Sequence, residues 1–145
     1  MTPRLAYFDT SVLVKRYVRE QNSAAARRML SRFRVVSCAL APLEIVSTLS
    51  RRRRAGEVSP DRHQVLVGRL RRDRTHWELV EVGPLVLDRA EEIIERTGLR
   101  SLDAVHIASA MVFQQVTRVQ IPFATADGQQ RQAASLLELE LVDLD

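Results

Sequence analysis

LAYFDTSVLVK, residues 5–15, is an apolar strand pattern that ends in one acid and runs directly into a helix pattern. Residues 5–9 predict a short buried strand, and residues 11–18 predict a helix that Asp9 or Thr10 can cap. A buried strand followed at once by a helix is the opening of a β-α unit, the building block of parallel sheets. This stretch therefore predicts an α/β fold.

The rest of the chain continues the alternation of strands with helices or helix pairs. Further strands are expected over residues 35–38, 77–82, 122–126 and 139–144. Further helices are expected over residues 23–33, 42–55, 60–73, 84–97, 102–116 and 128–137. Side chains that can cap these helices are Asn22 or Ser23, Ser59, Ser101 and Asp127. The pattern predicts one α/β domain with a mostly parallel sheet over residues 1–145.

The composition fits an ordinary water-soluble domain. Of the 145 residues, 46% are hydrophobic and 28% are charged, as in typical globular proteins. No apolar run approaches the roughly 20 residues that a membrane-spanning helix needs, and the N-terminus lacks a signal-peptide pattern. Cys38 is the only cysteine, which excludes an intrachain disulfide, and its apolar neighbours indicate a core residue. We expect a cytoplasmic protein.

Positive charge is concentrated in one part of the chain. The net charge is +4, and arginine supplies nearly all of the positive charge because Lys15 is the only lysine. Arginines gather between residues 51 and 74, whereas residues 136–145 are acidic. Because arginine binds phosphate groups well, we predict nucleic-acid contacts for Arg51, Arg52, Arg53 and Arg54. We predict the same for Lys15, which comes one helical turn after Ser11 and could reach the rim of an acidic pocket. A solvated helix face, or contacts with a protein partner, would explain the same arginines.

Acidic residues stand within or beside four apolar runs, at Asp9, Glu44, Asp103 and Asp127. We expect each to be partly buried, and a buried carboxylate needs a cation, a hydrogen-bonding cage or a metal ion. Two of them follow predicted strands and two lie in first helical turns, so all can meet at the carboxyl edge of a parallel sheet, where ligands bind. Oxygen ligands suit a hard divalent cation. Each acid taken alone could instead cap or begin a helix.

Other polar side chains accompany these acids. Thr10, Ser11 and Thr125 lie within two residues of the first or the last acid. Their hydroxyls could orient a carboxylate from outside the metal site, although local backbone caps would use the same groups. His106 lies one helical turn after the third acid and shares its helix face. We interpret His106 as a residue of the core rather than as a general base.

Four segments together resemble the acidic motifs of PIN-domain nucleases, and in particular of VapC-type toxins from bacterial toxin–antitoxin modules. They are FDTSVLVK (8–15), PLEIVSTLSR (42–51), LRSLDAVHIASA (99–110) and FATAD (123–127). Length, motif order and spacing fit over essentially the whole chain. The resemblance implies a three-layer α/β/α sandwich with a mostly parallel sheet of about four or five strands.

The resemblance also implies a function and partners. The chain would be the toxin of a toxin–antitoxin pair, a Mg²⁺- or Mn²⁺-dependent endoribonuclease that cleaves transfer, ribosomal or messenger RNA. Expected partners are a VapB-type antitoxin and a second copy of the chain, within a homodimer, a heterotetramer or a larger assembly. The alternative is a catalytically inactive RNA-binding or regulatory module, which the presence of all four acids disfavours.

Matched motif by motif, the resemblance assigns an acidic site. The family's four acids, which would be both catalytic residues and metal ligands, match in order Asp9, Glu44, Asp103 and Asp127. The accompanying hydroxyls match Thr10 or Ser11, and Thr125. The chain departs from the pattern in one place. GQQRQ (128–132) follows the fourth acid where some PIN nucleases carry a further acid, so we expect metal to be bound less tightly at this corner.

Overall fold

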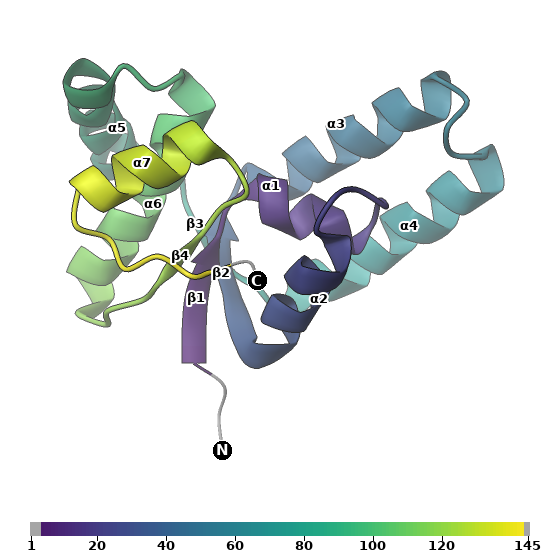
Figure 1. Cartoon of the computed structure of the whole chain (residues 1–145), viewed down its shortest axis with the longest axis horizontal. Helices are drawn as coiled ribbons and strands as arrows, with labels where there is room; N and C mark the ends of the chain where they lie inside the picture. Colours follow the sequence, from purple (N-terminus) through teal and green to yellow (C-terminus); the bar gives the residue numbers. More distant parts are fainter. Residues whose placement is uncertain (1–3, 144–145) are drawn as a thin grey trace.

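A four-stranded parallel sheet forms the centre of the protein in the computed structural model, which describes residues 4–143 (Figure 1). The strands are β1 (Arg4–Phe8), β2 (Phe33–Cys38), β3 (Glu78–Val80) and β4 (Phe123–Ala124). They lie in the order β3-β2-β1-β4, so β1 is interior and β4 is at an edge. All adjacent strands pair in parallel, which confirms the predicted sheet.

Helices cover both faces of this sheet, and the predicted three-layer α/β/α arrangement is confirmed (Figure 1). One layer contains α1 (Thr10–Leu13), a following 3₁₀ turn (Val14–Arg16), α2 (Ser23–Arg32), α3 (Ala41–Arg54) and α4 (Pro60–Asp73). The other contains α5 (Pro84–Thr97), α6 (Ser101–Thr117) and α7 (Gly128–Leu136). Figure 1 shows α3 and α4 as a helical hairpin that extends away from the sheet. Within residues 4–143, none of the helices is both long and apolar enough to cross a bilayer.

The two hydrophobic layers are built on the alternation of side chains along β1. Tyr7 belongs to the cluster that includes Ile107 of α6, whereas Phe8 belongs to the cluster that includes Ile45 of α3. Both aromatic side chains are fully buried. Successive strand residues point to opposite faces of a sheet, so consecutive apolar residues in LAYF require helices on both sides.

Local capping rules predicted some helix starts correctly and others wrongly. Asp9 and Asp127 occupy the N-cap positions of α1 and α7, and their side chains accept backbone hydrogen bonds. Asn22, one of the two predicted caps of α2, occupies the N-cap position, but its φ is left-handed at 66° and its side chain accepts no capping hydrogen bond. In α6 the N-cap is Arg100, and Ser101 is the first helical residue. The helices themselves form because their apolar faces pack on the sheet.

The edge of the sheet beyond β1 is shorter than the sequence predicts. Of the strand expected over 122–126, only Phe123 and Ala124 pair with β1. The strand expected over 139–144 is reduced to one parallel bridge between Phe123 and Leu141, and its last residue lies outside the described part of the chain. Charged residues alternate with apolar ones in this final run, which suits a solvent-facing edge.

Candidate active site

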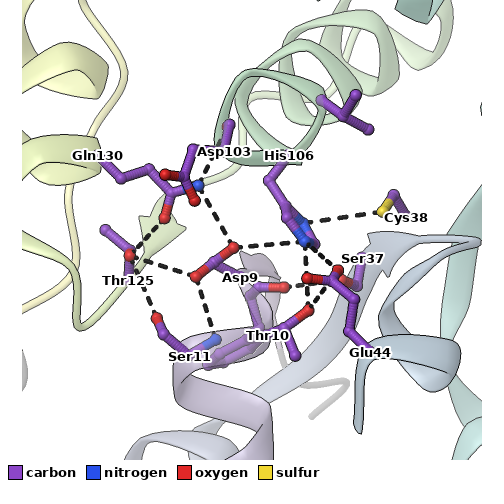
Figure 2. Close-up of polar contacts among 12 residues, drawn as sticks. Asp9, Thr10, Ser11, Ser37, Cys38, Glu44, Asp103, His106, Thr125 and Gln130 are labelled. Carbon is purple, nitrogen blue, oxygen red and sulfur yellow. Dashed lines mark hydrogen bonds and ion pairs between the residues drawn. The ribbon is translucent and has the colours of Figure 1, made fainter. Parts of the chain in front are cut away.

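The predicted acids meet at the carboxyl edge of the sheet, where they line one cleft of about 490 Å³. Asp9 follows β1, Glu44 lies in the first turn of α3, Asp103 lies in the first turn of α6, and Asp127 follows β4. Strand ends and helix starts share this edge because every strand runs the same way. The neighbouring side chains are drawn in Figure 2.

Burial differs strongly among the four acids. Asp9 is 5% exposed, Glu44 and Asp103 are half-buried, and Asp127 is exposed. The expectation that all four are partly buried is therefore wrong for Asp127. The local sequence FATAD suggested burial, but burial ends at Thr125, and Asp127 lies in the exposed segment that leads from β4 into α7.

The Asp9 carboxylate is held by hydrogen bonds to both of its oxygens (Figure 2). Oδ2 accepts from the Ser11 backbone N–H at 3.1 Å, and the Thr125 hydroxyl, which donates to Gln130, lies 3.5 Å from it. Oδ1 accepts from the Gln130 amide at 3.3 Å. These donors satisfy a carboxylate that would otherwise be costly to bury, and they fix its orientation.

Gln130 is a site residue that the sequence reasoning missed. It is fully buried, and its amide also donates to the backbone carbonyl of Asp103 at 3.1 Å. Its own carbonyl accepts from the Thr125 hydroxyl at 2.6 Å. Helical periodicity could have found it, because Gln130 shares a face with Ala133 and Ala134, which are also buried.

The predicted hydroxyl residues tie the segments around the cleft together. Thr10 donates to Glu44 Oε1 at 2.9 Å. The Ser11 hydroxyl lies 3.3 Å from that of Thr125 and accepts from the Ala126 backbone N–H at 2.9 Å. Thr10 therefore orients an acid directly, whereas Ser11 joins the start of α1 to the loop after β4.

His106 is buried, as expected for a core residue, but its ring contacts two of the acids (Figure 2). Nε2 lies 2.8 Å from Glu44 Oε1 and 3.4 Å from Asp9 Oδ1. Nδ1 lies 2.8 Å from the hydroxyl of Tyr7 and 3.8 Å from Cys38 Sγ. Burial disfavours the charged ring, but hydrogen bonds to Cys38 and Glu44 and the charge of Asp9 outweigh it and raise the pKa of His106.

Cys38, Glu44 and His106 place possible metal-binding atoms within 4.8 Å of one another. However, the Cys38 thiol faces Nδ1 whereas the Glu44 carboxylate faces Nε2. The two ring nitrogens direct their lone pairs to different sides of the imidazole, so one ion cannot use both contacts. This arrangement therefore suits a hydrogen-bonded chain better than a thiolate metal centre.

The acids repel one another across the cleft. The pKa of Asp103 is raised, first by burial and then by the negative charges of Asp9 and Asp127, while His106 and Arg100 act in the opposite direction. Such clustering favours a bound cation, which would offset the repulsion. The acidic groups that line the cleft offer carboxylate oxygens as metal ligands, and these are ligands that Mg²⁺ and Mn²⁺ prefer.

The predicted phosphate-binding residues occupy different surroundings. Arg51 lines the cleft and donates to the hydroxyls of two residues of its own helix. Arg52 forms an ion pair with Glu20 at 3.0 Å, and Arg53 and Arg54 are exposed at the end of α3. Lys15 is 6% exposed, and its ammonium group donates to Glu20 at 3.3 Å. Its surroundings give no support to the predicted phosphate contact of Lys15.

Comparison with known proteins identifies the family. The sequence model of the PIN-domain family matches residues 6–136. The chain belongs to the PIN-domain family. This PIN domain is 38% identical over 109 residues to Ribonuclease VapC46 of Mycobacterium tuberculosis, a match that covers 72% of each protein. The resemblance to VapC-type toxins is thereby confirmed.

Two solved structures share the fold of this PIN domain. The structure "Crystal Structure of FitAcB from Neisseria gonorrhoeae" superposes with a TM-score of 0.68 and 14% identity, covering 97% of this chain and 98% of the other. A toxin–antitoxin complex from Klebsiella pneumoniae gives a TM-score of 0.61 at 14% identity, covering 84% and 86%. At such low identity the likeness supports the fold alone.

Proposed function

We propose that this PIN domain is a metal-dependent endoribonuclease that acts as the toxin of a toxin–antitoxin pair. The main observation is that four carboxylates from separate elements line one cleft. The relationship to a protein named as a ribonuclease supports RNA as the substrate class. Transfer, ribosomal and messenger RNA are the candidate substrates.

The residues of the cleft suit Mg²⁺ or Mn²⁺. Asp9, Glu44 and Asp103 would hold the ion, and Asp127 would contribute directly or through water. A bound divalent ion would lower the pKa of a nearby water and polarise the scissile phosphate. Hydrolysis adds water to phosphorus and breaks the P–O3′ bond, which leaves a 5′-phosphate and a 3′-hydroxyl.

The protein's own contribution is to hold these acids in place. Asp9 needs no reorganisation because the Ser11 backbone N–H and the Gln130 amide already hold one carboxylate oxygen each. One oxygen of Glu44, Oε1, is held by the hydroxyl of Thr10. Acids held in advance lower the energetic cost of bringing charges together when the substrate binds.

RNA would reach the cleft along α3. Arg51 lines the cleft, and Arg53 and Arg54 continue along the same helix as exposed side chains. Phosphate contacts of this kind make the affinity depend on salt concentration. We assign the first phosphate contact to Arg51 because it is the arginine among the residues that line the cleft.

The proposed partners follow from the same family relationship. We propose a VapB-type antitoxin as the neutralising partner, because the chain is related to Ribonuclease VapC46 and VapC-type toxins come from toxin–antitoxin modules. We also propose a homodimer of this chain, assembled with antitoxin into a heterotetramer or a larger complex. The site of action would be the cytoplasm, where the RNA substrates lie.

Cleavage of RNA by the purified protein tests this function. Activity should require Mg²⁺ or Mn²⁺, should stop in excess chelator, and should be lost in Asp9→Asn and Asp103→Asn. Asp88→Asn is a matched control, because Asp88 is an exposed acid on α5. Full activity in both site variants would refute the proposal. RNA binding without cleavage by the unmodified protein would favour the inactive RNA-binding module instead.

A further inference from the structure

A hydrogen-bonded line of three side chains, two of them buried, leads from the sheet to the acidic cleft. The Tyr7 hydroxyl of β1 contacts His106 Nδ1 at 2.8 Å, and His106 Nε2 contacts Glu44 Oε1 at 2.8 Å. Tyr7 and His106 are both at most 1% exposed. The three residues come from β1, α6 and α3, so the line joins one strand to both helical layers.

Hydrogen-bond chemistry fixes the direction of the contact with Glu44. A carboxylate can only accept, so His106 Nε2 must donate to it whether the ring is neutral or charged. The contact at Nδ1 can run in either direction, because a tyrosine hydroxyl both donates and accepts. The line therefore holds together in both forms of the ring, and its role does not depend on titration of His106.

The two carboxylate oxygens of Glu44 differ in their hydrogen bonds to the protein. Oε1 receives the hydroxyl of Thr10 at 2.9 Å and the ring of His106 at 2.8 Å. Within residues 4–143, no protein donor is hydrogen-bonded to Oε2. One oxygen is thus held by the protein and the other is left for a ligand, as is common when a ligating carboxylate is hydrogen-bonded from behind.

An apolar side chain at position 106 would cost less free energy to bury than histidine does. The neighbouring residues Val105, Ile107 and Ala108 are buried, and a histidine in this setting must find partners for two nitrogens. Tyr7 is itself held, because its ring stacks on Phe123 with centroids 5.3 Å apart. The Tyr7 hydroxyl therefore orients the ring of His106 at Nδ1, and the ring in turn orients Glu44 through Nε2.

We propose that His106 is a positioning residue that fixes the Glu44 carboxylate for binding of a divalent cation, with Tyr7 holding the imidazole in place. The inference rests on the proposed function, because it assigns Glu44 as a ligand of that cation. It adds two residues, from β1 and α6, to the machinery of the site.

Calorimetric titration of the purified full chain with Mn²⁺ tests the proposal without reference to cleavage. His106→Leu should weaken Mn²⁺ binding by about 10–100-fold. His106→Gln should recover part of the loss, because its amide nitrogen can replace Nε2 as a donor. Tyr7→Phe should weaken binding less, because it removes only the hydroxyl behind the ring. Circular dichroism of each variant establishes that it is folded.

A double-mutant cycle with Glu44→Gln shows whether His106 acts through Glu44. In that background His106→Leu should cause little further loss of Mn²⁺ affinity, because the oxygen it positions no longer belongs to a charged ligand. An equal loss in both backgrounds would refute the proposal. Asp127→Asn in place of Glu44→Gln is the control cycle, because Asp127 is exposed and caps α7, and among the described residues it has no hydrogen bond or ion pair with His106.

The outcomes separate this inference from the proposed function. If the unmodified protein binds no Mn²⁺, the metal site and the role of His106 both fail. If it binds Mn²⁺ and His106→Leu binds it equally well, only the role of His106 fails. If His106→Leu does not fold, unchanged Mn²⁺ affinity in Tyr7→Phe refutes the proposal, and a loss of affinity in that variant supports it.

Discussion

Replacing Gln130 with leucine should destabilise the protein because it removes buried hydrogen bonds without creating a large cavity. The amide of Gln130 donates to Asp9 Oδ1 at 3.3 Å and to the Asp103 carbonyl at 3.1 Å, and its carbonyl accepts from Thr125 at 2.6 Å. Leucine has a similar volume but can make none of these contacts. The effect therefore measures the polar contacts rather than packing.

The size of the effect is set mainly by Asp9. A hydrogen bond to a charged group contributes about 1.5–3 kcal/mol, and a neutral one contributes about 1 kcal/mol. The contact with Asp9 is long, so its value belongs at the lower end of that range. Thr125 also accepts from the Asp127 backbone N–H, so its hydroxyl keeps a partner. We expect a net loss of about 2–3 kcal/mol in the free energy of unfolding.

Urea denaturation in chelator measures this loss without interference from metal binding. With a slope of about 2 kcal/mol per molar urea, the midpoint should fall by roughly 1–1.5 M. Gln129→Leu is the matched control, because Gln129 is the exposed neighbour in the same helix, and its midpoint should change little. Equal midpoints for the two variants would show that Gln130 does not support Asp9 and would refute the reasoning.

Two further predictions concern charge. Because the pKa of Asp103 is raised in the folded protein, its ionised form opposes folding at neutral pH, and the stability lost there returns as the pH falls through the raised pKa. Asp103→Asn should therefore stabilise the metal-free protein at pH 7 by less than about 1 kcal/mol, since solvent screens a half-exposed group. The gain should vanish below about pH 4, and thermal melts in chelator at both pH values check this. Arg51→Ala should weaken binding of single-stranded RNA and reduce the slope of log affinity against log salt by about 0.7, whereas Arg28→Ala, at an exposed position on α2, should leave both unchanged.

Local sequence rules were sufficient to predict that the acids lie at the carboxyl ends of the strands and that they meet there. Asp9 ends an apolar run and precedes a helix, so both its capping role and its position after a strand follow from neighbours in the sequence. The same reasoning applies to Asp127. Parallel topology then brings strand ends together whatever the loop lengths are. These features need no knowledge of packing.

The contacts that hold the acids could not be derived in this way. His106 and Glu44 are 62 positions apart, and Gln130 and Asp9 are 121 positions apart. Such pairs depend on the rotation of α6 and α7 against the sheet, which side-chain packing determines. Lys15 illustrates the same limit, because the 3₁₀ turn over Val14–Arg16 carries its ammonium group to Glu20.

The position of each strand in the sheet explains why the four acids differ. β1 is an interior strand between β2 and β4, so the acid at its end, Asp9, is enclosed and must be held by protein donors. β4 is an edge strand, and Asp127 after it is exposed and uses Oδ1 to cap α7. The cleft consequently has a closed end, with geometry fixed before any ligand arrives, and an open end where water has access. A phosphodiester from solvent would meet the open end first. If metal is bound less tightly at the fourth corner, as we predict, the exposure of Asp127 would contribute to this together with the absence of a further acid in residues 128–132.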